Sequence, residues 1–193
     1  MLSLKNSLKV LKKTNALLEG HFVLSSGLHS PQYIQCAKLL SNPKLSEKFI
    51  RSLASKIKKK IKKIDVVLSP AMGGIIIGYE IGKLLGKETI FCERVNKKFT
   101  LRRGFSIKKN SNVLIVEDVI TTGKSSLECV KLIKKSNAKL VGFACLIDRT
   151  SKTKLKNEII SQVKLKIPTY NKKNLPSFIK EIPVTKPGSR FLK

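Results

Sequence analysis

The sequence lacks the features of a membrane or secreted protein. No run of about 18 apolar residues occurs in its 193 residues, so no segment is predicted to cross a bilayer as a helix. Residues 1–18 alternate leucine with lysine and contain no continuous apolar stretch, which argues against a secretory signal. We therefore expect a cytoplasmic protein with no membrane partner.

Paired cysteines are absent as well. The four cysteines are widely spaced, form no CxxC pair, and each lies in or beside an apolar stretch: Cys36, Cys92, Cys129 and Cys145. This arrangement favours buried, reduced thiols over disulfides or a zinc site.

Acidic residues are scarce, with 12 against 40 basic residues. Such a surplus can serve nucleic-acid binding, capture of anionic substrates, or simple solvation of the surface. Only six of the basic residues are arginines, and the lysines are spread along the whole chain. A dedicated nucleic-acid surface usually contains more arginine and aromatic residues, so no nucleic-acid partner is expected.

The two ends of the chain are predicted to form small appendages. Leucines at helical spacing predict a helix over residues 4–18, which Gly20 ends. Residues 22–24 and 33–35 flank a turn and predict a hairpin or two short strands. The tail from residue 151 is polar and basic, with a strand expected near 163–167 and a short helix near 176–180.

The middle of the chain alternates short apolar runs with helical segments. A helix is predicted to begin at Pro43 and to reach about residue 62, and Gly86 can close a second, apolar helix. A third is expected over 124–135. The predicted strands are residues 66–68, 89–92, 113–117 and 140–147. This order predicts one α/β domain over 1–193, with a mostly parallel sheet flanked by helices, a core at about 41–150 and a hood at about 1–40.

Residues 113–126 carry the most specific pattern. Four apolar residues lead into Glu117 and Asp118, and a hydroxyl- and glycine-rich turn then opens a helix. Backbone N–H groups at a helix N-terminus bind phosphate, whereas adjacent carboxylates suit hydroxyl donors or a divalent cation. A phosphate on one side and a diol on the other describe ribose 5-phosphate.

Two other interpretations of this segment are weaker. Residues 123–125 could end a Walker A loop, but that motif needs glycine five positions before Gly123, and Asp118 stands there. The acids could also be a simple polar cap on a buried strand. Removing two neighbouring carboxylates from water costs too much free energy for a purely structural cap, so we disfavour that interpretation.

Residues 113–126 resemble the phosphoribosyl diphosphate (PRPP) signature of type I phosphoribosyltransferases. By that resemblance the two acids hold the ribose hydroxyls and residues 121–125 wrap the 5-phosphate. The PRPP contacts implied in this segment are Glu117, Asp118, Val119, Ile120, Thr121, Thr122, Gly123, Lys124 and Ser125.

Further segments resemble the orotate phosphoribosyltransferases within that class. They are residues 22–34, 69–75, 93–105, 148–150 and 186–190. The resemblance implies a pentosyltransferase of pyrimidine (UMP) biosynthesis. It would transfer ribose 5-phosphate from PRPP to orotate with Mg²⁺, giving orotidine 5'-phosphate and pyrophosphate. Purine phosphoribosyl transfer and a non-catalytic nucleic-acid-binding regulator on the same fold are the alternatives.

The orotate pocket is expected beside Arg149, because a guanidinium grips a carboxylate in bidentate fashion. A surface salt bridge with Asp148 is the other interpretation of Arg149. Tyr33 is expected to flank the flat ring, with Thr121 at its polar edge and Ser25 from the hood. Well-studied bacterial members carry lysines where Ser25 and Gly73 stand.

The pyrophosphate is expected to meet the loop at Met72, Gly73 and Gly74, where the family often has a non-proline cis peptide. Mg²⁺ is expected to bind mainly to PRPP and water, without direct protein ligands.

Residues 93–108 form either a solvated hairpin or a mobile basic flap that closes over the pyrophosphate. The resemblance implies a homodimer that shares this flap, with Arg94, Lys98 and Asp118 as catalytic residues. Lys97, Arg102 and Arg103 are further cations of the flap. No covalent nucleophile is evident, so displacement by the base nitrogen with inversion is predicted.

Overall fold

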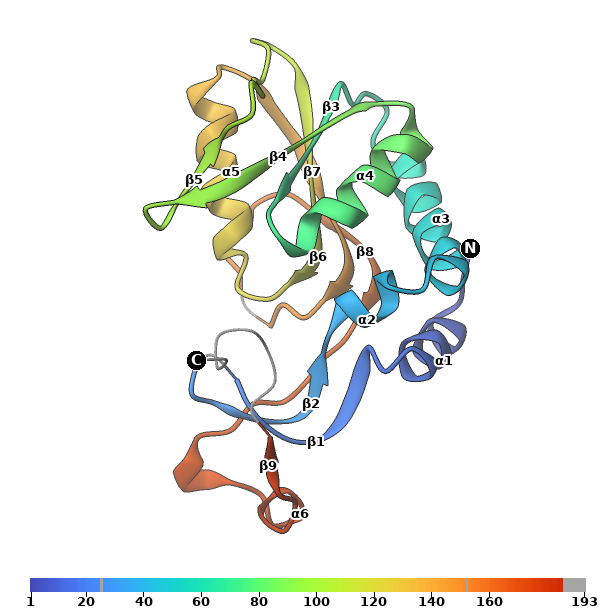
Figure 1. Cartoon of the computed structure of the whole chain (residues 1–193), viewed down its shortest axis with the longest axis vertical. Coiled ribbons are helices and arrows are strands. Elements are labelled where there is room, and N and C mark those ends of the chain that lie inside the picture. Colours follow the sequence, from blue (N-terminus) through green and yellow to red (C-terminus); the bar gives the residue numbers. More distant parts are fainter. Residues whose placement is uncertain (25, 152, 186–193) are drawn as a thin grey trace.

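The computed structural model describes residues 1–24, 26–151 and 153–185. Its centre is a six-stranded sheet in the order β5-β4-β3-β6-β7-β8 (Figure 1). Only the β4–β5 pair is antiparallel. The strands are β3 (Val66–Pro70), β4 (Glu88–Val95), β5 (Lys98–Leu101), β6 (Asn112–Ile120), β7 (Lys139–Asp148) and β8 (Ile159–Lys164).

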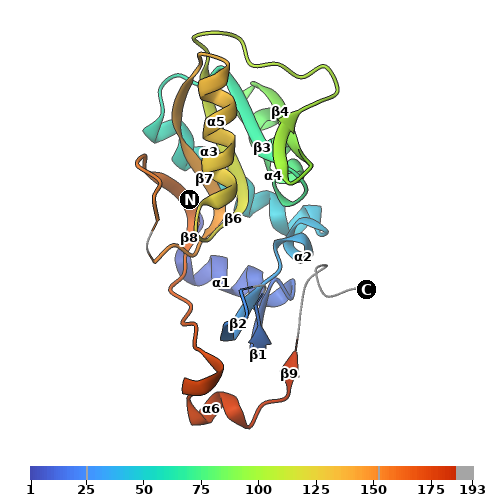
Figure 2. The same ribbon diagram turned by 90° about the vertical axis from the view of Figure 1, so that its left-hand side faces the viewer.

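Three long helices cover the two faces of this sheet. Figures 1 and 2 show α3 (Pro43–Lys60) and α4 (Gly73–Leu85) on one face and α5 (Lys124–Lys135) on the other. Successive residues of β6 alternate between the two apolar cores. Leu114 and Val116 join the core under α3 and α4, whereas Val113 and Ile115 join the core under α5. This arrangement confirms the predicted α/β class with a mostly parallel sheet.

A smaller sheet forms the hood, in the order β2-β1-β9. Here β1 (Leu17–Val23) pairs antiparallel with β2 (His29–Ile34) and parallel with β9 (Val184–Thr185), so the tail completes a sheet begun at the N-terminus. The remaining elements are α1 (Leu4–Lys13), α2 (Cys36–Leu40), η1 (Lys172–Asn174) and α6 (Ser177–Lys180).

The helix predicted over residues 4–18 is too long. It ends at Lys13, Asn15 adopts a left-handed conformation with φ 53°, and Leu17 starts β1 opposite Ile34. Leu17 is buried by this pairing. Strand pairing with a distant segment therefore overrides the local helical spacing of the leucines.

Local capping signals predict the other long helices well. Asn42 accepts a hydrogen bond from the Leu45 N–H and so begins α3 at Pro43, while Gly86, with φ 65°, ends α4. Helix α5 has the predicted limits. The strand expected near 163–167 begins and ends earlier in the chain, as β8. Residues 186–190, which carry part of the family resemblance, lie outside the described residues.

Two further expectations concern the whole chain. All four cysteines are free and buried, as predicted. Among the described residues, no helix is both long and apolar enough to span a membrane.

Candidate functional site

A cavity of about 1770 Å³ lies beyond the carboxyl ends of β6 and β7 and extends to the hood. Open α/β sheets bind ligands at this edge. The core contributes Glu117, residues 119–125, Glu128 and residues 149–151; the β4–β5 hairpin contributes Arg94 and Lys97; the hood and tail contribute Leu24, Ser26, Leu28, Tyr33, Gln35, Lys164 and residues 166–169.

The loop at 121–125 joins β6 to α5 at the floor of this cavity. Gly123 has φ 74°, and a Cβ there would lie 2.8 Å from Leu155 Cγ, so glycine fits both the conformation and the space. Thr121, Thr122 and Lys124 are exposed. The first N–H groups of α5 have no partner inside the helix, which makes this terminus suitable for a phosphate.

Strand β6 continues through Ile120, three residues further than predicted, so the two acids lie within the strand. Their side chains therefore point to opposite faces. Glu117 lines the cavity and accepts a hydrogen bond from the Ser126 hydroxyl of α5. Burial, and to a smaller extent the charge of Asp118, raises the pKa of Glu117 to about 7, although the Ser126 hydrogen bond opposes the shift.

Asp118 faces α4 and does not line the large cavity. A Cβ added at Gly73 would lie 2.6 Å from Asp118 Oδ2, so the carboxylate packs against the start of α4. Its Oδ1 accepts a hydrogen bond from the Val119 N–H at 2.8 Å. Burial raises the pKa of Asp118, and its hydrogen bonds with backbone N–H groups oppose that rise.

The loop before α4 thus lies next to Asp118 rather than in the large cavity. The Ala71–Met72 peptide is cis, as the resemblance implies. Gly74 packs closely, since its added Cβ would come within 3.1 Å of Pro70 Cδ and of the Val116 carbonyl oxygen.

Arg149 follows β7 and reaches the cavity beside the phosphate loop. Its N–H donates to the Ile120 carbonyl at 2.8 Å, which ties the ends of β6 and β7 together. Among the described residues its buried Nε has no hydrogen-bond partner. Burial lowers the pKa of Arg149, and the nearby Tyr33 opposes this effect.

The predicted alternative for Arg149, a salt bridge with Asp148, does not form. Asp148 instead lies 3.4 Å from Lys164 Nζ and accepts a hydrogen bond from the Thr150 N–H. Tyr33 stands in the cavity wall, its ring centroid 5.8 Å from that of Phe22. Ser25 lies outside the described residues, although Leu24 and Ser26 on either side of it line the cavity.

Part of the basic segment forms a hairpin, in which the end of β4 pairs antiparallel with β5. Arg94 and Lys97 line the cavity, whereas Lys98 is exposed and does not. Arg103 donates to Glu93 at 2.8 Å, and Arg102 lies 4.0 Å from the same carboxylate. Glu93 therefore holds both arginines outside the cavity wall.

Glu128 is a cavity residue that the sequence analysis missed. It binds both Nη atoms of Arg94, at 2.8 and 3.1 Å. One signal was present: Glu128 follows Lys124 by four residues in the helix predicted to begin at the phosphate loop. Residues at that spacing share a face of a helix, so the position of Glu128 near the loop follows from the sequence.

Comparisons with known proteins agree with this site. Residues 37–176 match the model of the phosphoribosyl transferase domain family. The orotate phosphoribosyltransferase of Parvibaculum lavamentivorans is 45% identical over 187 residues, covering 96% of both chains. That of Erythrobacter litoralis is 45% identical over 185 residues, covering 95% of this chain and 96% of the relative.

A solved structure shares the fold as well. The crystal structure of orotate phosphoribosyltransferase from Aeropyrum pernix superposes with a TM-score of 0.72 at 26% identity, covering 82% of this chain and 93% of that one. The chain therefore belongs to the phosphoribosyltransferase family and, within it, to the orotate phosphoribosyltransferases.

Proposed function

We propose that this protein transfers ribose 5-phosphate from PRPP to orotate in the cytoplasm, as a Mg²⁺-dependent step of pyrimidine biosynthesis. The products are orotidine 5'-phosphate and pyrophosphate. One observation carries the proposal: a single cavity joins the phosphate-type loop at 121–125 to the guanidinium of Arg149.

The loop end of the cavity suits the sugar phosphate. Backbone N–H groups at the start of α5 and the hydroxyls of Thr121, Thr122 and Ser125 offer donors to the 5-phosphate. Glu117 lines this end of the cavity, and Asp118 lies on the opposite face of β6 beside Gly73. We propose that the ribose sits across the strand, so that its hydroxyls donate to both carboxylates.

The Arg149 end suits the base. The buried Nε of Arg149 has no hydrogen-bond partner among the described residues. It can donate to the orotate carboxylate, and this bond would remove the free-energy cost of a buried, unpaired donor. We propose that Tyr33 packs on the pyrimidine ring, with Thr121 at its polar edge and Ser25 contributing from the hood.

The proposed reaction is a single displacement. The base nitrogen gives up its proton to water and bonds to the anomeric carbon as the bond from that carbon to the pyrophosphate oxygen breaks, and the electron pair of the broken bond leaves with pyrophosphate. Arg94 and Lys98 neutralise charge on the leaving group, while Met72, Gly73 and Gly74 provide backbone donors near it. Asp118 stabilises the positive character of the ribose.

We propose that Mg²⁺ is carried mainly by the substrate. The described residues contain no group of three His, Cys, Asp or Glu side chains arranged to hold a metal. The two carboxylates of Glu117 and Asp118 provide few direct ligands, which suits an ion bound mostly by phosphates and water. When bound, Mg²⁺ would supply charge neutralisation of the pyrophosphate.

We also propose a homodimer. The N-cap of α4 and the helix itself expose three large side chains at helical spacing, Met72 at 82%, Ile76 at 54% and Tyr79 at 62%. A contiguous face of this kind is typical of a protein interface, and it begins at the loop beside Asp118. We further propose that in this dimer Lys98, which does not line the cavity of its own chain, acts in the partner's cavity. Sedimentation velocity should give a dimer for the unmodified chain and a monomer for Ile76→Asp.

The activity test follows orotate by its ultraviolet absorbance after addition of PRPP and Mg²⁺. The proposal predicts a decrease in orotate with matching release of pyrophosphate. Adenine, hypoxanthine and xanthine serve as competing acceptors. Turnover of a purine without turnover of orotate would refute the proposed substrate.

A further inference from the structure

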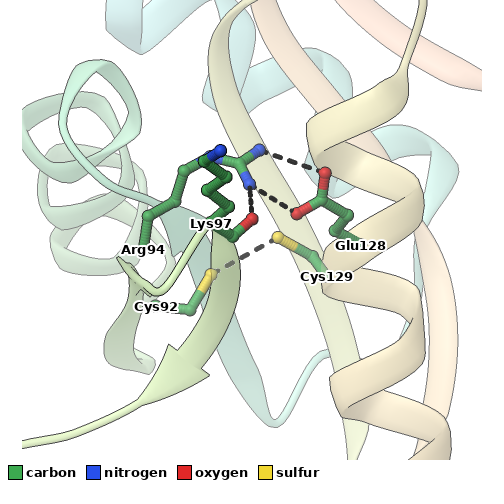
Figure 3. Close-up of polar contacts among 5 residues, drawn as sticks. All are labelled: Cys92, Arg94, Lys97, Glu128 and Cys129. Carbon is green, nitrogen blue, oxygen red and sulfur yellow. Dashed lines mark hydrogen bonds and ion pairs between the residues drawn. The ribbon is translucent and has the colours of Figure 1, made fainter.

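The guanidinium of Arg94 is held from three directions where β4 meets α5, and Figure 3 shows two of them, Glu128 and Lys97. Glu128 accepts from Nη1 at 2.8 Å and from Nη2 at 3.1 Å. The Lys97 carbonyl accepts from Nη1 at 2.7 Å, and the Phe99 ring lies beneath, with its centroid 4.1 Å from Cζ. These contacts fix both the plane and the rotation of the group.

Among the described residues, no hydrogen bond occupies the remaining edge of the guanidinium. An arginine side chain carries five N–H donors in a planar fork. Glu128 and Lys97 use both donors of Nη1 and one of Nη2. The remaining donors are Nε–H and the second Nη2–H, which lie on the same edge and form a second bidentate fork that matches phosphate.

Arg94 and Glu128 belong to the same cavity as the phosphate loop. Both line it, together with Lys97 and residues 121–125. Glu128 is one helical turn after Lys124, so the carboxylate connects Arg94 directly to the helix whose first turn forms the phosphate site. Any rotation of Arg94 away from the cavity would break two charge-assisted hydrogen bonds.

The junction beneath this pair is tightly packed. Cys92, two residues before Arg94, and Cys129, next to Glu128, are fully buried, and their Sγ atoms lie 3.5 Å apart. This contact joins β4 to α5 directly beneath the Arg94–Glu128 pair (Figure 3). The Glu128 hydrogen bond also raises the pKa of Arg94, so the guanidinium keeps its charge.

We infer that Glu128 is a positioning residue, which orients Arg94 so that its free fork faces the departing pyrophosphate. The inference rests on the proposed function, because it needs a pyrophosphate leaving group. In this role Glu128 acts only through Arg94 and does not contact the substrate.

The test compares Glu128→Ala, Glu128→Gln and Arg94→Ala in steady-state kinetics with orotate and PRPP. Loss of a charge-assisted pair should lower kcat of Glu128→Ala about tenfold. The KM for PRPP should change less than about twofold, since the orientation matters most in the transition state. Glu128→Gln, which retains one acceptor, should recover part of the lost kcat. Glu47→Gln, which removes an exposed ion pair with Arg51, is the matched control and should behave as the unmodified protein.

A double-mutant cycle gives the decisive readout. If Glu128 acts through Arg94, then Glu128→Ala should have no further effect on kcat in an Arg94→Ala background. Three outcomes would overturn the inference. The first is an equal loss of kcat in both backgrounds, and the second is an unchanged kcat in Glu128→Ala. The third is tighter PRPP binding with a higher kcat in Glu128→Ala, which would show that the carboxylate competes with the substrate as an anion. If the unmodified protein fails to convert orotate, the proposed function is refuted before the variants are compared.

Discussion

Replacing Glu117 by glutamine should stabilise the protein above neutral pH. Glu117 is a buried carboxyl on β6, and its hydrogen-bond partner is the Ser126 hydroxyl. Glutamine has nearly the same shape, and its carbonyl oxygen can still accept from that hydroxyl. The substitution therefore removes the cost of a buried charge and leaves the packing unchanged.

The pH dependence follows from the raised pKa. Folding shifts the pKa of Glu117 from 4.5 to about 7, chiefly because burial disfavours the charged form. Between these values the native state binds a proton that the unfolded state has released, so this group's contribution to stability falls as pH rises from about 4.5 to about 7. At 1.36 kcal/mol per pKa unit, the charged form costs roughly 3 kcal/mol above pH 7.

Urea denaturation at several pH values from 5 to 8.5 measures this difference. The free energy of unfolding of Glu117→Gln should exceed that of the unmodified protein by roughly 3 kcal/mol at the alkaline end, with a much smaller gap near pH 5. Glu47→Gln, at an exposed site on α3, should show no such trend. Parallel pH profiles for Glu117→Gln and the unmodified protein would refute the reasoning.

Three further perturbations test the site. Gly73→Ala places a Cβ 2.6 Å from Asp118 Oδ2, and the resulting overpacking, roughly 1–3 kcal/mol, should displace that carboxylate and weaken PRPP binding in calorimetry. Lys48→Ala, on the exposed surface of α3, is the control and should leave PRPP binding unchanged. Arg149→Lys should raise the KM for orotate roughly tenfold and leave the KM for PRPP unchanged, because lysine lacks the bidentate fork; equal changes in both would contradict the assignment. Chelation with EDTA should abolish turnover and added Mg²⁺ should restore it, whereas full activity in EDTA would contradict a metal-dependent step.

Features encoded by neighbouring residues were predictable from the sequence. The start of α3 follows from the Asn42 cap and Pro43, and the end of α4 follows from a left-handed Gly86. The phosphate loop could be recognised for the same reason, since its glycine, hydroxyls and acids lie within ten residues of one another.

Features encoded by distant residues were not predictable. Leu17 carries a helical signal but pairs with Ile34 in the hood sheet. The extension of β6 to Ile120 depends on its register with β7, where Ile120 pairs with Asp148. That extension sends the neighbouring acids to opposite faces, which a short strand ending at residue 117 did not suggest.

The Arg94–Glu128 pair shows the same limit at the site. These residues are 34 positions apart and meet only because β4 and α5 pack together. Charge patterning along the chain identified Arg94 as one of several flap cations. Charge patterning could not show that Arg94 has an acidic partner in the cavity, whereas Arg102 and Arg103 form ion pairs with Glu93.

The central claim is that the loop before α5 and the two acids of β6, Glu117 in the cavity and Asp118 on the opposite face, bind PRPP together. A crystal structure of the protein with PRPP and Mg²⁺ tests it most directly. The account predicts the 5-phosphate within hydrogen-bonding distance of the N–H groups of residues 122–125, with ribose hydroxyls on the carboxylates of Glu117 and Asp118. A 5-phosphate bound away from that loop, or ribose hydroxyls that touch neither carboxylate, would contradict the account.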